Sequence, residues 1–478
     1  MNIILIVFDT LRKDCVGAYG APPSWGDVHV PHFEAFARES LVMERAYPNV
    51  LPTLPARVAL YSGKQVYPYE QGDIRLKGDF VGSPGWGPIP EEWPTLAETL
   101  QEGGYRTALI SDLFHMFKPS KNFWRGFDQW TFLRGQETDP ARSGPRLTQA
   151  EIDYWLPDEL RSVLKYQGNG EDILVEFIQQ CIMNFSGRTK ETDFFAPRIF
   201  QEAALWLEQN QDADQFFLMV ESFDPHEPWL IPPHYRRMYR DVDDQEQVIS
   251  YYHELNGSSH SLLERTQANF RGAVSLCDRW FGYFYETLRV LGRLDDTMVI
   301  LTADHGHSLG EESYVGKRGY PSRPEVYDLP LLVRFPGGEH AGIHSRAFVQ
   351  HVDLTASILE MAGVEPAHEL DGRDFVPAAL SGGQGWRDHA TVGWGSTPTV
   401  ITDRWWFNCK VDGTGIFLHD LHAPDPFARN LADDDRAVVE RLFGTALADA
   451  GGRFPDWLID LAATEADAPG CSKLAARL

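Results

Sequence analysis

Three residues that can bind a metal follow two apolar segments of the chain. Asp9 comes directly after the apolar run 3–8, and Asp304 and His305 follow the apolar run 298–302. Runs of this kind are typical of buried parallel strands, whose carboxyl ends meet at one edge of a sheet. Two carboxylates and an imidazole at such an edge form a suitable ligand set for a divalent metal. Each residue alone also has a structural explanation, since an Asp after a strand is often a helix cap.

A second motif supplies a hydroxyl group and a positive charge. Residues 51–64 read LPTLPARVALYSGK, with Thr53 as the hydroxyl and Arg57 as the cation. The alternative explanation for Thr53 is a helix N-cap. The motif resembles the sulfatase signature, in which Cys-x-Pro-Ser-Arg precedes a Leu-x-Thr-Gly-Arg-like segment; here Thr53 stands for the Cys and Ala56 for the Ser. Five further positions fit that pattern: Pro55, Arg57, Leu60, Gly63 and Lys64.

The resemblance to the alkaline phosphatase/sulfatase superfamily extends over nearly the whole chain. It includes an opening metal motif at residues 9–20 and a small-domain ending at residues 418–431. Between them, similar segments occur in the family's order and spacing at 104–108, 126–128, 224–229, 304–306, 316–317, 352–354 and 371–372.

The resemblance implies a metal site. Asp9, Asp304 and His305 are the expected ligands, and Thr53 is expected to share the metal. The Asp304-His305 pair is similar to that of phosphonate monoester hydrolases and phosphoethanolamine transferases, whereas many calcium sulfatases have Asn in place of the His. A nitrogen ligand favours zinc or manganese over calcium. Thr10, which stands where many sulfatases have a second acid, and Asp14 are further candidates.

The same resemblance assigns roles to four residues. Thr53 is the expected nucleophile, since a metal lowers the proton affinity of a coordinated hydroxyl, and Arg57 balances charge beside it. Lys317 would hold a non-bridging oxygen of the anionic transition state, and His226 would donate to the leaving group. The alternatives are a solvated surface lysine for Lys317 and a structural role for His226.

Further residues are candidates for the surroundings of the site. Lys64 is expected to hold the nucleophile loop. Whether a second ion is bound is left open by the sequence, and Asp224 and His226 are the residues that could reach it. Two tryptophans are candidates for contact with the body of a substrate, although packing is the commoner role. The full set of these outer candidates is Lys64, Asp73, His115, Asp224, His307, Trp25 and Trp229.

The threonine changes the expected chemistry. Sulfatases with this signature use a formylglycine made from Cys or Ser, and we expect none here, because Thr is not a substrate for that oxidation. An ester on plain threonine must be released by direct attack at phosphorus or sulfur. This favours a phosphate diester or a phosphonate monoester as substrate. A sulfate ester or promiscuity between the two, a phosphoryl-type transferase and a non-catalytic relative remain alternatives.

Composition limits the partners. The net charge of −26 disfavours nucleic acid and requires a metal or a local cation cluster to attract a small anionic ester. The short N-terminal apolar run lacks a basic flank, and no stretch approaches a membrane span. The five cysteines are scattered, without metal-binding spacing. We therefore expect a cytoplasmic protein without membrane or nucleic-acid partners, and the sequence leaves open whether it is a monomer or a homo-oligomer.

The elements that must position these residues indicate an α/β fold. Further apolar strands are predicted at 107–110 and 216–220, with helices at 268–288 and 352–362. We expect an alkaline phosphatase-like sheet sandwiched by helices over residues 1–375, with an insertion at about 136–193. Residues 376–478 are expected to form a smaller α+β subdomain. Its short antiparallel sheet is predicted from strands at 390–394, 399–403, 405–411 and 416–421.

Overall fold

The computed structural model describes most of the chain. The described residues are 1–69, 83–118, 120–161, 171–241, 249, 252–255 and 260–464. No helix among them is long and apolar enough to cross a membrane.

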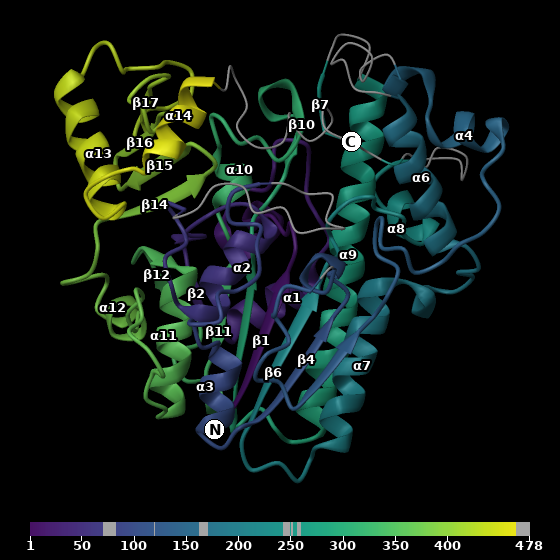
Figure 1. Ribbon diagram of the computed structural model, residues 1–478. Helices are drawn as coiled ribbons and strands as arrows, with labels where there is room; N and C mark the ends of the chain where they lie inside the picture. Colours follow the sequence, from purple (N-terminus) through teal and green to yellow (C-terminus); the bar gives the residue numbers. More distant parts are fainter. Residues whose placement is uncertain are drawn as a thin grey trace.

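A large sheet forms the centre of the molecule (Figure 1). Its middle strand, β1 (Asn2–Phe8), pairs in parallel with β6 (Phe216–Ser222) on one side and β8 (Thr297–Ala303) on the other. All three strands are completely buried, which explains why they read as near-continuous apolar runs. The full order is β12 (His344–Ser345), β2 (Leu41–Met43), β11 (Leu331–Arg334), β8, β1, β6, β4 (Arg106–Ser111) and β5 (Gln129–Phe132).

One side of this sheet is mixed. β11 runs antiparallel to both β8 and β2, while β4, β5 and β6 remain parallel to β1. The expected α/β sheet is therefore confirmed, with one reversed strand that the apolar pattern did not reveal.

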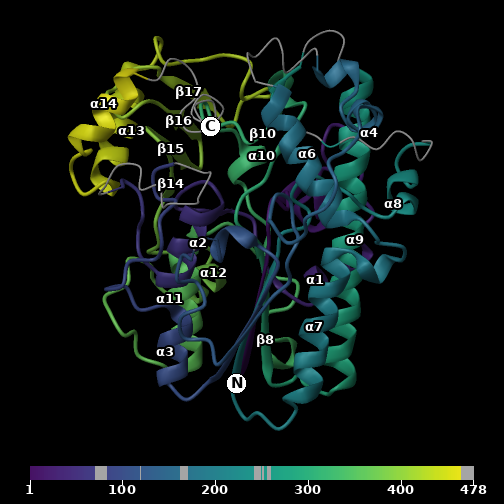
Figure 2. The same cartoon turned by 45° about the vertical axis from the view of Figure 1, so that its right-hand side comes forward.

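Helices cover both faces of the sheet (Figure 2). The long helix α9 packs with α7 and α1 on one face, and α11 packs with α2 and α3 on the other. The bounds are α1 Pro31–Arg38, α7 Phe195–Gln209, α9 His260–Val290, α2 Thr53–Ser62, α3 Leu96–Glu102 and α11 His351–Ala362. This arrangement confirms the expected sandwich.

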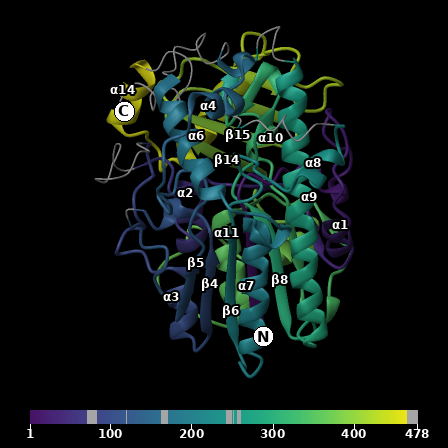
Figure 3. The ribbon, with the colours of Figure 1, turned by 90° about the vertical axis from the view of Figure 1, so that its right-hand side faces the viewer.

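Two additions lie at the carboxyl end of the central strands (Figures 1 and 3). The insertion contributes α4 (Gln149–Trp155) and α6 (Glu171–Phe185). The C-terminal part forms a four-stranded antiparallel sheet, as expected, followed by α13 (Arg436–Asp449) and α14 (Asp456–Thr464). Its strands are β14 His389–Trp394, β15 Thr397–Thr402, β16 Trp405–Asn408 and β17 Phe417–Asp420.

Short elements complete the fold around the site. The strands are β3 Ala46–Tyr47, β7 His253–Glu254, β9 Ser308–Leu309, β10 Tyr314–Gly316 and β13 Val349–Gln350, and the helices are α8 Pro233–Arg237, α10 Pro324–Tyr327 and α12 Val376–Leu380.

The C-terminal sheet supports the segment that leads into α2. Leu51 donates its backbone N–H to the carbonyl of Gly393 in β14 at 2.8 Å, and Val50 forms a bridge with the same residue. Val50 also shares a buried apolar cluster with Val400 and Phe407 of the C-terminal sheet. The C-terminal part is thus packed into the scaffold that holds Thr53.

Candidate active site

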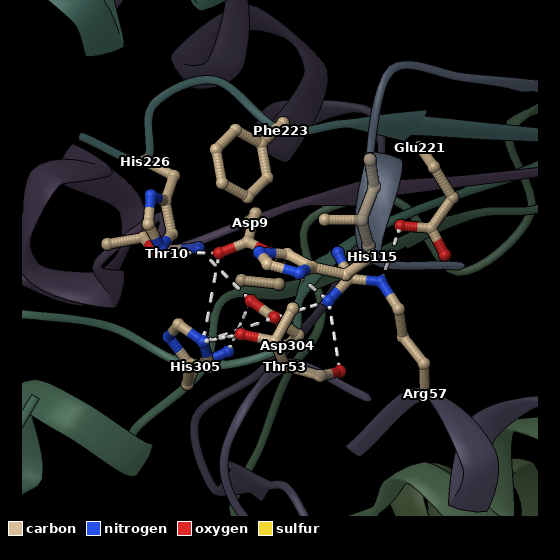
Figure 4. Close-up of polar contacts among 12 residues, drawn as sticks. Asp9, Thr10, Thr53, Arg57, His115, Glu221, Phe223, His226, Asp304 and His305 are labelled. Carbon is tan, nitrogen blue, oxygen red and sulfur yellow. Dashed lines mark hydrogen bonds and ion pairs between the residues drawn. The ribbon is translucent and has the colours of Figure 1, made fainter. Parts of the chain in front are cut away.

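The metal-ligand candidates meet at the carboxyl ends of two adjacent strands (Figure 4). β1 and β8 pair in register up to Phe8 and Ala303, so the residues that follow, Asp9 and Asp304, emerge side by side. One ligand atom each from Asp9, Asp304 and His305 lie within 4.8 Å of one another, and all three residues are buried. Among the described residues this is the one group of three such side chains that meets this criterion.

The chemistry of these three side chains suits a divalent metal. The Nδ1–H of His305 faces the carbonyl oxygen of Gly306 at 3.0 Å, which leaves the Nε2 lone pair directed at the carboxylates. Burial lowers the pKa of His305 to about 3, so this imidazole is a neutral donor. Burial and then the charge of Asp304 raise the pKa of Asp9. Oδ2 of Asp9 accepts no hydrogen bond from the described residues. The donor set therefore fits a metal such as zinc or manganese.

Thr10 orients both carboxylates. Its backbone N–H donates to Oδ1 of Asp304 at 3.1 Å, and its hydroxyl donates to Oδ1 of Asp9 at 2.8 Å. Thr10 has a φ of 68°, which a β-branched residue rarely adopts. Strain of this kind persists where the surrounding structure enforces it, often at functional sites.

Thr53 is the first residue of α2. The N-cap is Pro52, without a side-chain cap, so the N-cap explanation for Thr53 is wrong. Its Oγ1 lies 3.1 Å from Nε2 of His305 and 3.4 Å from Nζ of Lys317. The hydroxyl is therefore directed at the metal ligands, at a helix N-terminus that favours anions.

Arg57 lies one turn further along α2 and is completely buried. Its Nη1 contacts Oδ2 of Asp304 at 2.5 Å and Oδ2 of Asp9 at 3.2 Å, and its Nε donates to Glu221 at 2.9 Å. The same Nη1 donates to the backbone carbonyl of Thr53 at 3.1 Å. Arg57 thus neutralises the ligand carboxylates and fixes the start of α2. Glu221 was not predicted, although a Glu within the apolar run of β6 is the signal that could have revealed it.

Lys317 and His226 form a buried pair beside Thr53. Nζ of Lys317 lies 2.8 Å from Nε2 of His226, while Nδ1–H of His226 donates to the carbonyl of Glu227 at 2.8 Å. Burial and then Lys317 lower the pKa of His226, so the imidazole accepts a hydrogen bond from the ammonium. Lys317 is 5% exposed, which excludes the solvated surface lysine.

Several outer candidates lie elsewhere. Asp14 pairs with Arg12 at 2.6 Å. Lys64 lies at the end of α2, away from Thr53, and binds Asp371 at 2.8 Å. These contacts place both residues outside the group of side chains around Thr53. Asp73 lies outside the described residues. Trp25 donates to Glu311 at 3.1 Å and packs on Phe270.

Asp224 supports the insertion. It accepts hydrogen bonds from the side chain of Gln136 at 3.1 Å and from the backbone N–H of Ala196 at 3.0 Å. Gln136 also donates to Asp112 at 2.8 Å. Asp224 therefore fixes the insertion and the start of α7, and it does not join His226 in a group of three metal-binding side chains among the described residues.

His115 and His307 belong to a second buried group, together with two glutamates that sequence reasoning missed. Nε2 of His115 lies 3.4 Å from Oε2 of Glu137, and Nδ1 of His307 lies 3.6 Å from Oε2 of Glu227. Oε2 of Glu227 also lies 3.3 Å from Nδ1 of His226. The one sequence signal for Glu227 was its position next to His226.

The helix-covered sheet, with a group of possible metal ligands at the carboxyl ends of its central strands, is the architecture of the alkaline phosphatase/sulfatase superfamily. The sequence profile described as Sulfatase matches residues 1–364, and the chain belongs to this family. It is accordingly a hydrolase that acts on sulfuric or phosphoric ester bonds.

Individual relatives include both phosphorus and sulfur enzymes. The chain is 25% identical to the multifunctional alkaline phosphatase superfamily protein PehA of Trinickia caryophylli, over 80% of this chain and 77% of that protein. It is 23% identical to an N-acetylglucosamine-6-O-sulfatase of Bacteroides thetaiotaomicron, over 80% of this chain and 71% of that protein. The fold is similar to the phosphonate monoester hydrolase of Agrobacterium radiobacter, with a TM-score of 0.68, 20% identity and coverage of 94% and 95% of the two chains.

Proposed function

We propose that this protein hydrolyses phosphate diesters or phosphonate monoesters, with Thr53 as the nucleophile. The observation that carries the proposal is the position of the Thr53 hydroxyl, between His305 of the metal-ligand group at 3.1 Å and the Lys317 ammonium at 3.4 Å. Asp9, Asp304 and His305 would hold the metal, with Thr53 sharing it. A bound zinc or manganese ion supplies a lowered proton affinity for that hydroxyl and a positive charge for the ester anion.

The residues of the chain then supply positioning and proton transfer. Thr53 Oγ1 attacks phosphorus as the alkoxide, the form in which it is released again in the second step; the bond from phosphorus to the leaving oxygen breaks, and Lys317 stabilises a non-bridging oxygen. The leaving oxygen takes its proton from the hydrogen-bonded pair of Lys317 and His226. A water then attacks phosphorus, the bond to Thr53 breaks, and the proton of the water returns to the pair.

Phosphorus is favoured because the nucleophile is threonine. A formylglycine hydrate carries a second hydroxyl that expels sulfate by elimination, and a plain threonine lacks this group. Release from Thr53 requires direct attack of water at the central atom. Relatives named for phosphonate monoester hydrolysis support this choice. Relatives named as sulfatases make sulfate esters the second candidate.

Side-by-side rates test the proposal. Purified protein with zinc or manganese is assayed on bis(4-nitrophenyl) phosphate, 4-nitrophenyl methylphosphonate and 4-nitrophenyl sulfate, with mass spectrometry of the peptide that contains Thr53. We expect higher kcat/KM on the phosphorus esters, an unmodified threonine, and loss of turnover in Thr53→Ala with metal retained. A clear preference for sulfate would reject the substrate class. Near-full activity in Thr53→Ala would reject the nucleophile, and absence of activity and of metal would favour a non-catalytic relative.

A further inference from the structure

Two buried glutamates lie beside the groups that would protonate the leaving oxygen. Glu227 follows His226 in the chain, and Glu137 comes from the insertion. They are 5% and 9% exposed, and Oε2 of each accepts no hydrogen bond from the described residues. Unsatisfied buried carboxylate oxygens are costly and call for a partner.

A third polar side chain in this region is also unsatisfied. His307 is 1% exposed, and neither of its ring nitrogens makes a hydrogen bond with the described residues. Its Nδ1 points to Oε2 of Glu227 at 3.6 Å, too far for a hydrogen bond. An imidazole and two carboxyl groups with polar atoms that make no hydrogen bond to the described residues indicate that a polar or charged ligand binds between them.

The charges of this group select the sign of the missing partner. Burial raises the pKa of Glu137 and of Glu227 to about 7, although Lys317 lowers both and a hydrogen bond with Tyr252 also lowers that of Glu227. Two ionised glutamates exceed the single ammonium of Lys317 by one negative charge. An added cation would balance the group and keep both glutamates ionised.

Aromatic rings surround the same side chains. The ring of His307 makes edge contacts with Trp229 at 5.3 Å and Tyr252 at 5.6 Å. Trp86 meets the ring of His115 at 5.3 Å, and that imidazole is in turn the neighbour of Glu137. Carboxylates combined with aromatic rings are the surroundings that bind alkylammonium groups, through charge and cation–π attraction.

The position relative to Thr53 identifies which part of the substrate would lie here. In an in-line displacement the leaving oxygen departs on the side opposite the nucleophile, towards the pair of Lys317 and His226. Glu227 is the neighbour of His226 in this pair, with Oε2 3.3 Å from Nδ1 of the imidazole whose Nε2 faces Lys317. An alcohol that takes its proton from this pair would have Glu227 and His307 as neighbours.

We infer that Glu137, Glu227 and His307 form a leaving-group subsite that selects esters of amino alcohols with a positively charged nitrogen. The inference rests on the proposed function and names its substrate class. A zwitterionic ester of this kind also avoids the repulsion that a net charge of −26, to which these two carboxylates contribute, imposes on a simple anion.

Two isosteric phosphonate monoesters test the inference. Choline methylphosphonate has a positively charged quaternary nitrogen at the position where 3,3-dimethylbutyl methylphosphonate has an uncharged carbon. Each compound has a single ester bond, so the leaving alcohol is unambiguous. Hydrolysis of both esters is measured by ³¹P NMR. We expect kcat/KM to be about tenfold higher for the choline ester, which corresponds to about 1.4 kcal/mol of cation recognition. Glu137→Gln and Glu227→Gln should each decrease this preference.

A matched variant controls for the loss of a buried carboxyl group elsewhere. Glu325 is a glutamate whose pKa is also raised to about 7 by burial, and its Oε1 accepts a hydrogen bond from Ser308 at 3.0 Å. Glu325→Gln should retain the preference for the choline ester. The same two esters titrated by calorimetry into Thr53→Ala protein give the ratio of Kd values without turnover.

The outcomes separate this inference from the proposed function. Equal kcat/KM and equal Kd for the two esters in the wild-type background overturn the inference, whether or not the glutamine variants fold. The preference retained in both glutamine variants overturns the assignment to Glu137 and Glu227. Absence of hydrolysis of 4-nitrophenyl methylphosphonate contradicts the proposed function alone, because the calorimetric comparison still decides the subsite.

Discussion

Replacement of Arg57 by methionine should destabilise the metal-free protein strongly. The guanidinium is completely buried and contacts Glu221 at 2.9 Å, Asp304 at 2.5 Å and Asp9 at 3.2 Å. Its removal leaves three buried carboxylates without this counter-charge. Breaking a buried ion pair in this way costs about 3–5 kcal/mol in the free energy of unfolding. Methionine retains most of the side-chain volume, so packing contributes little to the loss.

The metal should change this cost in a defined direction. Nη1 of Arg57 contacts one oxygen each of Asp9 and Asp304, the carboxylates that would hold the ion. Guanidinium and metal therefore supply charge to the same groups. Added zinc or manganese should raise the unfolding midpoint more in Arg57→Met than in the wild type. For comparison, a free metal concentration one hundred times Kd stabilises a folded protein by about 2.7 kcal/mol.

Urea unfolding followed by tryptophan fluorescence, with and without metal, measures both effects. Lys64→Met is the matched control, since Lys64 follows the C-cap of the same helix and forms a partly exposed pair with Asp371. Such pairs contribute about 0.2–1 kcal/mol. An Arg57→Met deficit no larger than that of Lys64→Met would refute the reasoning. A metal-induced shift equal to that of the wild type would show that Arg57 and the metal do not act on shared carboxylates.

Two further predictions concern the metal and the C-terminal part. Asp304→Asn should abolish stoichiometric metal in elemental analysis while Thr53→Ala retains it; calcium as the bound metal would reject the zinc or manganese assignment. The pKa of His389 is raised, first by its hydrogen bond to Asp449 and also by Asp388. A pKa that is higher in the folded than in the unfolded state stabilises the folded protein at pH values below the unfolded-state pKa of about 6.5. This stabilisation is lost as the pH rises through the folded-state pKa. His389→Gln should therefore lower the unfolding midpoint more at pH about 5.5 than at about 9; an equal loss at both would exclude this linkage.

The strands that carry the metal ligands could be predicted because burial on both faces makes them nearly uniformly apolar. β1 and β8 begin and end within a residue or two of the expected runs, and their parallel pairing brings Asp9 and Asp304 together. The reversed direction of β11 could not be predicted, since a four-residue buried strand has the same composition in either direction. The length of α9 was also underestimated, because its first turns precede the segment with the clearest apolar spacing.

The pairings of the polar groups that surround Thr53 could not be predicted, because they depend on contacts between segments that are distant in the sequence. Arg57 was expected to balance charge, but its bond to Glu221 joins α2 to β6, 164 positions apart in the chain. Glu137 approaches His115 only because the insertion folds back over the carboxyl edge of the sheet. Neither pairing has a local sequence pattern, since both depend on how strands and insertion are arranged in space.

The arrangement of charge suggests why this site can combine a metal with a leaving-group subsite. Beside the candidate metal ligands, Arg57 forms ion pairs with Asp9, Asp304 and Glu221, so its charge is neutralised by carboxylates of the protein itself. Lys317 is instead hydrogen-bonded to the neutral His226, which leaves its ammonium available to an incoming anion. The carboxylates beyond His226 then act on whatever follows the leaving oxygen. Attraction of the ester anion and selection of the alcohol are thereby assigned to different side chains, so a change in the outer glutamates can alter substrate choice without removing the groups that stabilise the reacting centre.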